Sequence, residues 1–396
     1  MKSSYMVKLV DPAKLVIVSI LSVAISACSS GQSSFSLLPT SQQFQQSNSS
    51  TSNKVDLLWV IDNSPSMIPA QANILNNISS FMTNFQSKNL DFKLAVTTTE
   101  AYLGGSAYTG NNAYSKFRNG ATLYQLDQFG RPTNVVSYSK YSGIFVVIPG
   151  VPDLINTFIT NAYQGDQGSG DERAFRSLQI TLNESQNAGF HRPDAYLAVI
   201  ILSDEDDFSG DSRIEGSWIG QLPGESNVQF AARYVPDHSY VAPTLDSVGT
   251  YISYLDTFTN STASNRHYNV SAISVLDSAC QATQNSSGSP NSIVGQRYMD
   301  IASQTNGTVG SLCDANFSQT LTKIQENILE LSSQFFLQRA PIVSSITVAV
   351  NSAVIAQDPV NGWTYNSVSN AIVFHGFSIP PQGANIEIHF DPTTIK

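Results

Sequence analysis

Between residues 54 and 338, short apolar runs alternate with segments whose apolar residues recur at helical spacing. The runs VDLLWVI, FKLAVTT, GIFVVIP, YLAVIIL and YNVSAISVL have the length and composition of buried strands. Ile74, Ile78 and Phe81 follow the first run at the spacing of one helix face. Such alternation is typical of a parallel sheet covered by helices. We therefore predict a doubly wound α/β domain, with helices near 153–163, 171–186, 244–259, 296–305 and 317–335.

The pattern changes after about residue 339, where apolar and polar residues alternate with period two. SSITVAV, AIVFHGF and NIEIHF are separated by Pro, Gly and Asn turn signals. These runs predict a small all-β domain over 339–396. A segment this short buries little surface, so it should either pack against the α/β domain or form a compact sandwich of immunoglobulin-like type.

Two insertions interrupt the α/β pattern. Residues 101–141 are rich in Gly, Asn, Ser and Tyr, and residues 208–243 carry Trp218, Tyr234 and Tyr240. The second insertion follows the run YLAVIIL and is therefore placed to shape what reaches the end of that strand. The alternative is that its aromatic residues pack the loop onto the sheet edge.

The amino terminus resembles an export signal. Lys2, Lys8 and Lys14 precede LVIVSILSVAIS, an apolar stretch too short to span a bilayer. Residues 25–28, ISAC, resemble a bacterial lipobox, which implies removal of residues 1–27 and attachment of lipid to Cys28. The alternative is an ordinary secretory signal with a coincidental cysteine. With Ser29 next, the resemblance implies anchoring to the outer membrane of a two-membraned cell envelope, facing either the periplasm or the surface.

Residues 28–53 are polar and rich in Ser and Gln. We predict a flexible tether here, because the segment has no apolar periodicity. Beyond Cys28 the chain has two cysteines, Cys280 and Cys313, and in an exported protein these should form a disulfide. The formal net charge of -10 argues against a nucleic-acid partner.

The first predicted strand ends in DNSPS, which places oxygen-bearing side chains at alternate positions. Asp62, Ser64 and Ser66 can converge on one point in a turn that leaves a strand. A carboxylate and two hydroxyls are hard oxygen ligands that suit a small divalent cation. Because the hydroxyls are neutral, a bound cation keeps positive charge and an open position for an acidic group. The alternative, that Asp62 and Ser66 cap the following helix, is compatible with this role.

This turn resembles the metal-ion-dependent adhesion site of von Willebrand factor type A domains. The resemblance implies a second aspartate after a later central strand, which matches Asp204 behind YLAVIIL, and a hydroxyl in a loop between them, which matches Ser169. Asp171 or Glu172 could serve in place of Ser169. It also implies a cation, Mg²⁺ first and Mn²⁺ or Ca²⁺ as alternatives.

The acidic residues that follow Asp204 admit two interpretations. Glu205, Asp206 and Asp207 could bind a second cation or tune the first site, or they could form a solvated loop. The solvated loop fits Glu205 and Asp206 better than Asp207. None of the three is assigned as a ligand.

The sequence lacks G-x-S-x-G, G-x-x-x-x-G-K and H-E-x-x-H, so we expect no enzyme. The resemblance implies a lipid-anchored adhesin or binding protein that captures an acidic group of a protein, peptide or glycan through the cation. The alternative is a periplasm-facing scaffold whose metal is structural or absent. A metal-assisted hydrolase is the weakest of the three hypotheses.

Overall fold

The computed structural model describes residues 40–45, 54–87, 90–126, 132–210, 214–215, 226, 228–229, 234–235, 245–287, 291–381 and 383–393. The predicted signal at 1–27 and the lipidation site Cys28 lie outside these residues. No helix in the described ranges has the length and apolar character to cross a membrane.

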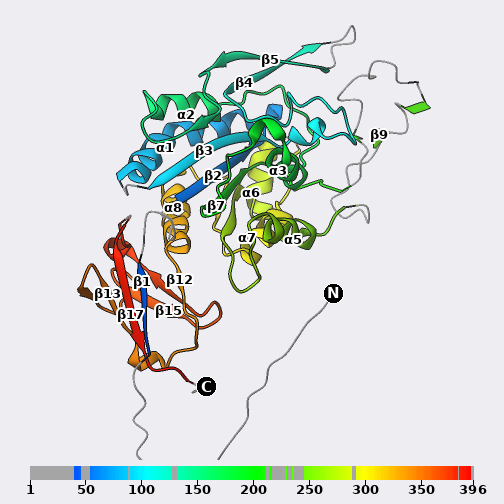
Figure 1. The fold of residues 1–396 in the computed structure, drawn as a ribbon. Coiled ribbons are helices and arrows are strands. Elements are labelled where there is room, and N and C mark those ends of the chain that lie inside the picture. Colours follow the sequence, from blue (N-terminus) through cyan, green and yellow to red (C-terminus); the bar gives the residue numbers. More distant parts are fainter. Residues whose placement is uncertain are drawn as a thin grey trace, which may run out of the picture. The chain divides into compact units, whose positions relative to one another are not determined.

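A six-stranded sheet forms the centre of the α/β domain (Figure 1). Its strands, in spatial order, are β11 (Val309–Ser311), β10 (Tyr268–Ser274), β7 (Tyr196–Leu202), β2 (Lys54–Ile61), β3 (Asp91–Thr98) and β6 (Val146–Val147). All neighbouring pairs are parallel except β3 and β6. The sheet confirms the predicted parallel α/β class, although the run GIFVVIP contributes only the two-residue β6.

Helices cover both faces of this sheet, and the side chains of β2 alternate between them. Trp59 and its alternate neighbours face the core that includes α1 (Ile68–Ser87), α2 (Leu154–Ala162) and α8 (Ser318–Ser332). Leu58 and Val60 face the core that includes α3 (Ala174–Asn183), α5 (Val248–Phe258) and α7 (Gln296–Gln304). Because both faces are covered, every residue from 55 to 61 is buried.

The other described elements of this domain lie between those strands and helices. They are η1 (Pro65–Met67), η2 (Ala101–Gly104), β4 (Gly120–Leu126), β5 (Pro132–Tyr141), η3 (Ser185–Asn187), β8 (Ile214–Glu215), β9 (Tyr234–Val235) and α6 (Ser278–Ser286). Strands β4 and β5 form an antiparallel hairpin in the first predicted insertion. Trp218 and Tyr240 of the second insertion lie outside the described residues.

Two small antiparallel sheets contain the remaining strands. One has the order β1 (Thr40–Gln45), β17 (Asn385–Phe390), β13 (Thr347–Val350) and β14 (Ala353–Ile355), and the other β12 (Phe335–Phe336), β16 (Ala371–Phe374) and β15 (Trp363–Asn366). The turns η4 (Val343–Ser345) and η5 (Gly376–Ser378) lie between these strands. Apolar residues of both sheets share one core.

Strand β1 corrects the prediction of a flexible tether over 28–53. Residues Thr40–Gln45 pair antiparallel with β17, so that Thr40 lies opposite Phe390 and Gln45 opposite Asn385 (Figure 1). The pairing uses backbone N–H and C=O groups, so a polar segment without apolar alternation can still form an edge strand. This small sheet thus contains one strand that precedes the α/β domain in the sequence and strands that follow it.

Candidate metal site at the carboxyl edge of the sheet

The two predicted carboxylates lie beyond adjacent parallel strands. Asp62 directly follows β2, and Asp204 comes two residues after the end of β7. The backbone N–H of Asp62 donates to the carbonyl of Leu202 at 2.9 Å, which fixes the two strand ends beside each other. This edge is where ligands bind in open α/β sheets.

The structure brings Asp62, Ser64, Ser66 and Asp204 together. The N–H of Ser64 donates to Asp62 Oδ1 at 2.8 Å, and the hydroxyls of Ser64 and Ser66 are 3.0 Å apart. The Ser66 hydroxyl donates to Asp204 Oδ1 at 3.2 Å. Hydrogen bonds therefore link Asp62 to Asp204 through the Ser64 N–H and the hydroxyls of Ser64 and Ser66.

Ser169 lies in a loop that is docked against this turn. The N–H of Gly168 donates to the carbonyl of Asn63 at 2.7 Å. Ser169 is buried, its N–H donates to Glu100 Oε2 at 3.3 Å, and its hydroxyl accepts from the N–H of Asp171 at 3.0 Å. The loop that carries Ser169 is thus fixed to Asn63, the residue between Asp62 and Ser64.

The two alternatives to Ser169 differ in their surroundings. Asp171 accepts from Arg173 at 2.8 and 3.0 Å and from the hydroxyl of Tyr102 at 2.9 Å. Both carboxylate oxygens of Glu172 are buried and have no hydrogen-bond partner among the residues that the structure describes. Asp171 is therefore part of a buried ion pair, whereas Glu172 is not.

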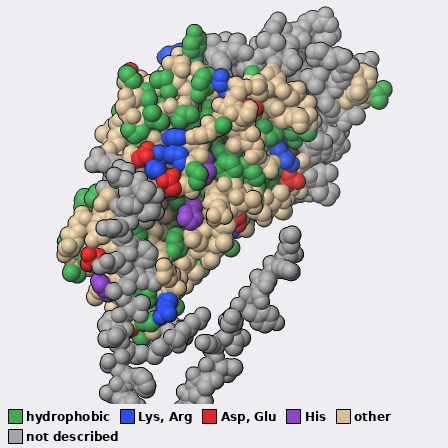
Figure 2. Space-filling model, in the orientation of Figure 1, with side chains coloured by type: hydrophobic (Ala, Val, Ile, Leu, Met, Phe, Trp, Pro, Cys, Tyr) green, Lys and Arg blue, Asp and Glu red, His purple; other side chains and the backbone are tan. Residues whose placement is uncertain are grey.

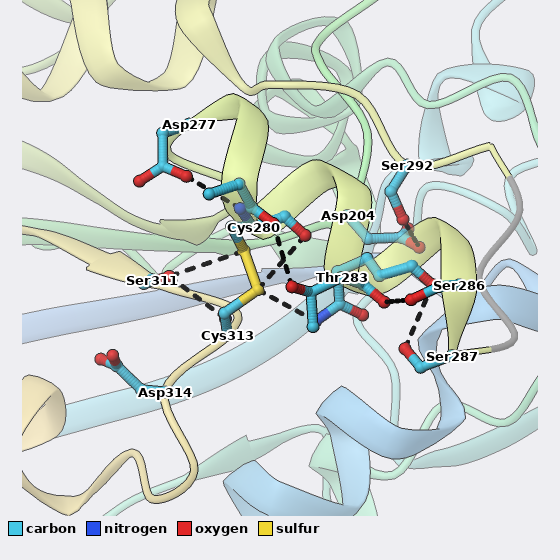
Figure 3. The surroundings of a disulfide bond; sticks show 12 residues. Asp204, Asp277, Cys280, Thr283, Ser286, Ser287, Ser292, Ser311, Cys313 and Asp314 are labelled. Atoms are coloured by element: carbon cyan, nitrogen blue, oxygen red, sulfur yellow. Dashed lines mark hydrogen bonds between the residues drawn. A yellow bond between two sulfur atoms is a disulfide. The ribbon is translucent and has the colours of Figure 1, made fainter.

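Two hydroxyls beyond the predicted site residues contact the aspartates. Ser203 donates to Asp62 Oδ2 at 2.8 Å, and Ser292 donates to Asp204 Oδ2 at 3.2 Å. Ser203 could have been found as the neighbour of Asp204 in the sequence. Ser292 could not, because it lies 88 positions away in a loop beyond α6, close to the disulfide (Figure 3).

Buried acidic groups are concentrated at this edge of a chain with few charges. Charged residues make up 13% of the sequence, and they are sparse on the face shown in Figure 2. Carboxylates are seldom buried without a partner. The carboxylates that are at most 4% exposed in this region are Asp62, Glu100, Asp171, Glu172, Asp204, Asp206 and Asp207.

The electrostatics of the site favour a cation. Burial raises the pKa of Asp62 well above its usual value, and the neighbouring Asp204 raises it further. Burial likewise raises the pKa of Asp204. Within the described ranges, no three side chains of the His, Cys, Asp and Glu types are grouped to hold a metal. A cation here would therefore depend on two carboxylates and several hydroxyls, a set of hard oxygens that fits Mg²⁺, Mn²⁺ or Ca²⁺.

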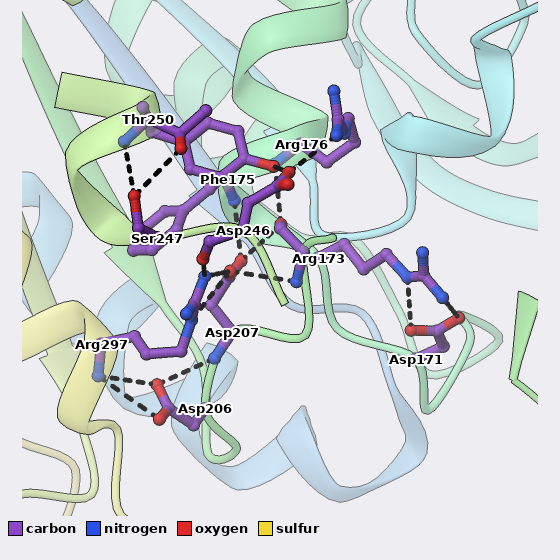
Figure 4. Close-up of polar contacts among 12 residues, drawn as sticks. Asp171, Arg173, Phe175, Arg176, Asp206, Asp207, Asp246, Ser247, Thr250 and Arg297 are labelled. Carbon is purple, nitrogen blue, oxygen red and sulfur yellow. Dashed lines mark hydrogen bonds and ion pairs between the residues drawn. The ribbon is translucent and has the colours of Figure 1, made fainter. Parts of the chain in front are cut away.

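The acidic run after Asp204 is not a solvated loop, because Glu205, Asp206 and Asp207 are all buried. Asp206 Oδ1 accepts from the N–H groups of Asp207 at 2.9 Å and Arg297 at 3.0 Å. Asp207 accepts from the Arg297 guanidinium at 3.1 Å and from the N–H of Phe175, in the first turn of α3, at 2.9 Å (Figure 4). No sequence pattern predicts this pairing with Arg297. The pairing favours a structural role for Asp206 and Asp207 over a second cation site.

Comparisons with known proteins assign no family to this chain. No protein-family model matches this chain, and no curated protein matches it. Among solved structures, the open conformation of the pilus adhesin SpaC from Lactobacillus rhamnosus GG aligns with 12% identity and a TM-score of 0.35, over 87% of this chain and 39% of that one. The pilus adhesin RrgA from Streptococcus pneumoniae aligns with 11% identity and a TM-score of 0.25, over 88% and 57%. Proximal thread matrix protein 1 of the mussel byssus aligns with 9% identity and a TM-score of 0.34, over 76% and 52%. This chain thus spans about two fifths of SpaC and just over half of the other two proteins.

Replacing Gly168 by alanine is expected to disturb the turn at Asp62. A Cβ at this position would lie 2.4 Å from Asn63 Cγ and 2.6 Å from the Asn63 carbonyl oxygen, so the loop or the turn has to move. We expect a loss of about 1–3 kcal/mol in the free energy of unfolding, measured by urea titration. The control is Gly170→Ala, since a Cβ there meets nothing within 4 Å. Equal stability of the two variants would contradict the prediction.

Proposed function

We propose that this chain is a lipid-anchored cell-envelope binding protein of von Willebrand factor A type, with a divalent cation held by Asp62, Ser64, Ser66 and Asp204. The observation that carries the proposal is the hydrogen-bonded chain from Asp62 through both serines to Asp204 at the carboxyl edge of the sheet. Ser169 belongs to the proposed site as the hydroxyl of the middle loop. Cys28 is the proposed point of lipid attachment.

In the proposed mechanism, the residues of this chain fill only some of the coordination positions of the cation. Two carboxylates and the serine hydroxyls supply only part of the oxygen ligands that a divalent ion takes, and the hydroxyls add no charge. The cation can still accept a further ligand at a position that faces outward. An acidic group of a partner protein, peptide or glycan would fill that position, as in an adhesin. The proposal includes no catalytic step.

Metal binding is tested by calorimetry on residues 29–396, with Mg²⁺, Mn²⁺ and Ca²⁺ as separate titrants. We expect the wild type to bind at least one of these ions. Asp62→Ala and Asp204→Ala should each weaken that binding more than about 100-fold, because losing a charged direct ligand costs more affinity than losing an outer contact. The control is Asp194→Ala, which removes a carboxylate paired with Lys54 at the opposite end of β2. A folded wild type that binds none of the three ions would contradict the proposal and favour a periplasm-facing scaffold.

Partner capture is tested separately, on intact cells and with the purified chain. If the protein is an adhesin, protease or antibody should reach it on intact cells, and its partner should be released by a chelator. Binding that persists in Asp204→Ala and in the presence of chelator would contradict capture through the cation.

A further inference from the structure

Glu172 is a fully buried glutamate whose carboxylate has no hydrogen-bond partner in the described part of the chain. Its exposed fraction is 0%, and neither Oε1 nor Oε2 has a hydrogen bond to any described residue. Its backbone carbonyl accepts from the N–H of Phe208 at 2.8 Å, which fixes this residue beside the loop that begins at Asp204. A buried carboxylate in this situation is strongly unfavourable unless it is neutralised or compensated.

Other buried carboxylates at this edge do have partners, and Glu100 offers the closest comparison. It is also 0% exposed, yet its Oε1 accepts from Asn63 Nδ2 at 2.8 Å and its Oε2 from the N–H of Ser169 at 3.3 Å. The guanidinium of Arg118 lies 3.6 Å from Glu100 Oε1. A buried carboxylate in this region can therefore have hydrogen-bond partners, as Glu100 does, and Glu172 differs from it in this respect.

The charges around Glu172 are mostly of its own sign. Burial raises the pKa of its carboxyl well above the usual value, and Glu205, Asp62 and Asp204 raise it further. The carboxyl of Glu172 therefore belongs electrostatically to the candidate metal site. A divalent cation between Asp62 and Asp204 would supply the positive charge that this group of carboxylates lacks.

We propose that Glu172 is a positioning residue of the cation site, which accepts hydrogen bonds from water ligands of the bound ion. This inference rests on the proposed function. An outer position agrees with the lack of three grouped carboxylates in the described ranges, and cations such as Mg²⁺ keep several water ligands that need acceptors. Glu172 thus acts in addition to the hydroxyl of Ser169, from an outer position, and it tunes how tightly the cation is held.

The test uses Glu172→Gln in residues 29–396, with MgCl₂ and CaCl₂ as the probes. We expect cation affinity to fall roughly 10–100-fold, as for other outer carboxylates. We also expect the melting temperature without cation, in chelator, to rise by about 2–4 °C, because a neutral amide replaces a carboxylate without partners. The matched control is Glu100→Gln, which should lower the melting temperature without cation, since it weakens the pairing with Arg118.

The outcomes separate the two proposals. If the wild type binds cation, Asp204→Ala does not, and Glu172→Gln binds as tightly as the wild type, the inference about Glu172 is overturned and the proposed function stands. If Glu172→Gln lowers the melting temperature without cation as Glu100→Gln does, Glu172 is structural and the inference is likewise overturned. If the folded wild type binds neither cation, both proposals fail.

Discussion

Replacing Arg297 by alanine is expected to lower the free energy of unfolding by about 3–5 kcal/mol at pH 8, since it leaves a buried carboxylate uncompensated. The Arg297 guanidinium donates to Asp207 Oδ2 at 3.1 Å and to the carbonyl of Asp246 at 2.7 Å. Its backbone N–H donates to Asp206 at 3.0 Å. The residue thereby connects α7 to the loop after β7 (Figure 4). Urea unfolding in the presence of chelator measures the effect.

The deficit of Arg297→Ala should depend on pH. Burial raises the pKa of Asp206 to about 7 and raises that of Asp207, while Arg297 opposes both shifts. A carboxyl whose pKa is higher in the folded protein contributes stability that is present below its unfolded value, near 4, and is lost as the pH rises toward the folded value. Without Arg297 the folded pKa values rise further, so both carboxyls are largely protonated at pH 5 and the deficit shrinks there.

Arg266→Ala is the matched control for Arg297→Ala. Arg266 pairs with Asp256 at 2.9 Å, with both side chains partly exposed, and such pairs contribute at most about 1 kcal/mol. We expect a small deficit that changes little between pH 5 and pH 8. A deficit of Arg297→Ala that is equally small, or equal at the two pH values, would contradict the structural role assigned to Arg297.

Loss of the disulfide is expected to cost about 3–4 kcal/mol of unfolding free energy. Cys280 in α6 and Cys313 after β11 are joined across a sequence separation of 33, as the sequence predicted (Figure 3). In the chain-entropy account, the bond restricts the unfolded chain. Urea unfolding should show the same loss in the reduced wild type and in the double variant Cys280→Ala/Cys313→Ala.

The disulfide should also influence the proposed cation site. The loop that it encloses contains Ser292, whose hydroxyl donates to Asp204 Oδ2, and Ile293, whose N–H donates to the Asp204 carbonyl at 2.9 Å. Freedom in this loop would weaken the support of Asp204. We expect calorimetry to show weaker binding of Mg²⁺ in the reduced protein under conditions where it remains folded. Equal Mg²⁺ affinity in the oxidised and the folded, reduced protein would contradict this prediction, and unchanged stability after reduction would contradict the preceding one.

The sequence by itself determined the sheet and the local part of the site. Runs such as VDLLWVI and YLAVIIL are apolar at nearly every position, and their alternation with helical segments favours a parallel sheet that is covered on both faces. Asp62, Ser64 and Ser66 are close because they are neighbours in the chain, and Asp204 could be added because adjacent parallel strands end at one edge. These features depend on short-range pattern and on general rules of topology.

Only the tertiary structure decided which carboxylates have partners. Asp171 is hydrogen-bonded to Arg173 and Tyr102, and Asp207 to Arg297. The Glu172 carboxylate has no hydrogen bond to a described residue, although all three lie in similar acidic segments. The pairing of β1 with β17 could not be predicted from the sequence either, because it joins backbone groups more than 300 positions apart and requires no side-chain pattern. Contacts of this kind depend on how distant segments pack in the folded chain, and the periodicity of apolar residues along the sequence does not predict them.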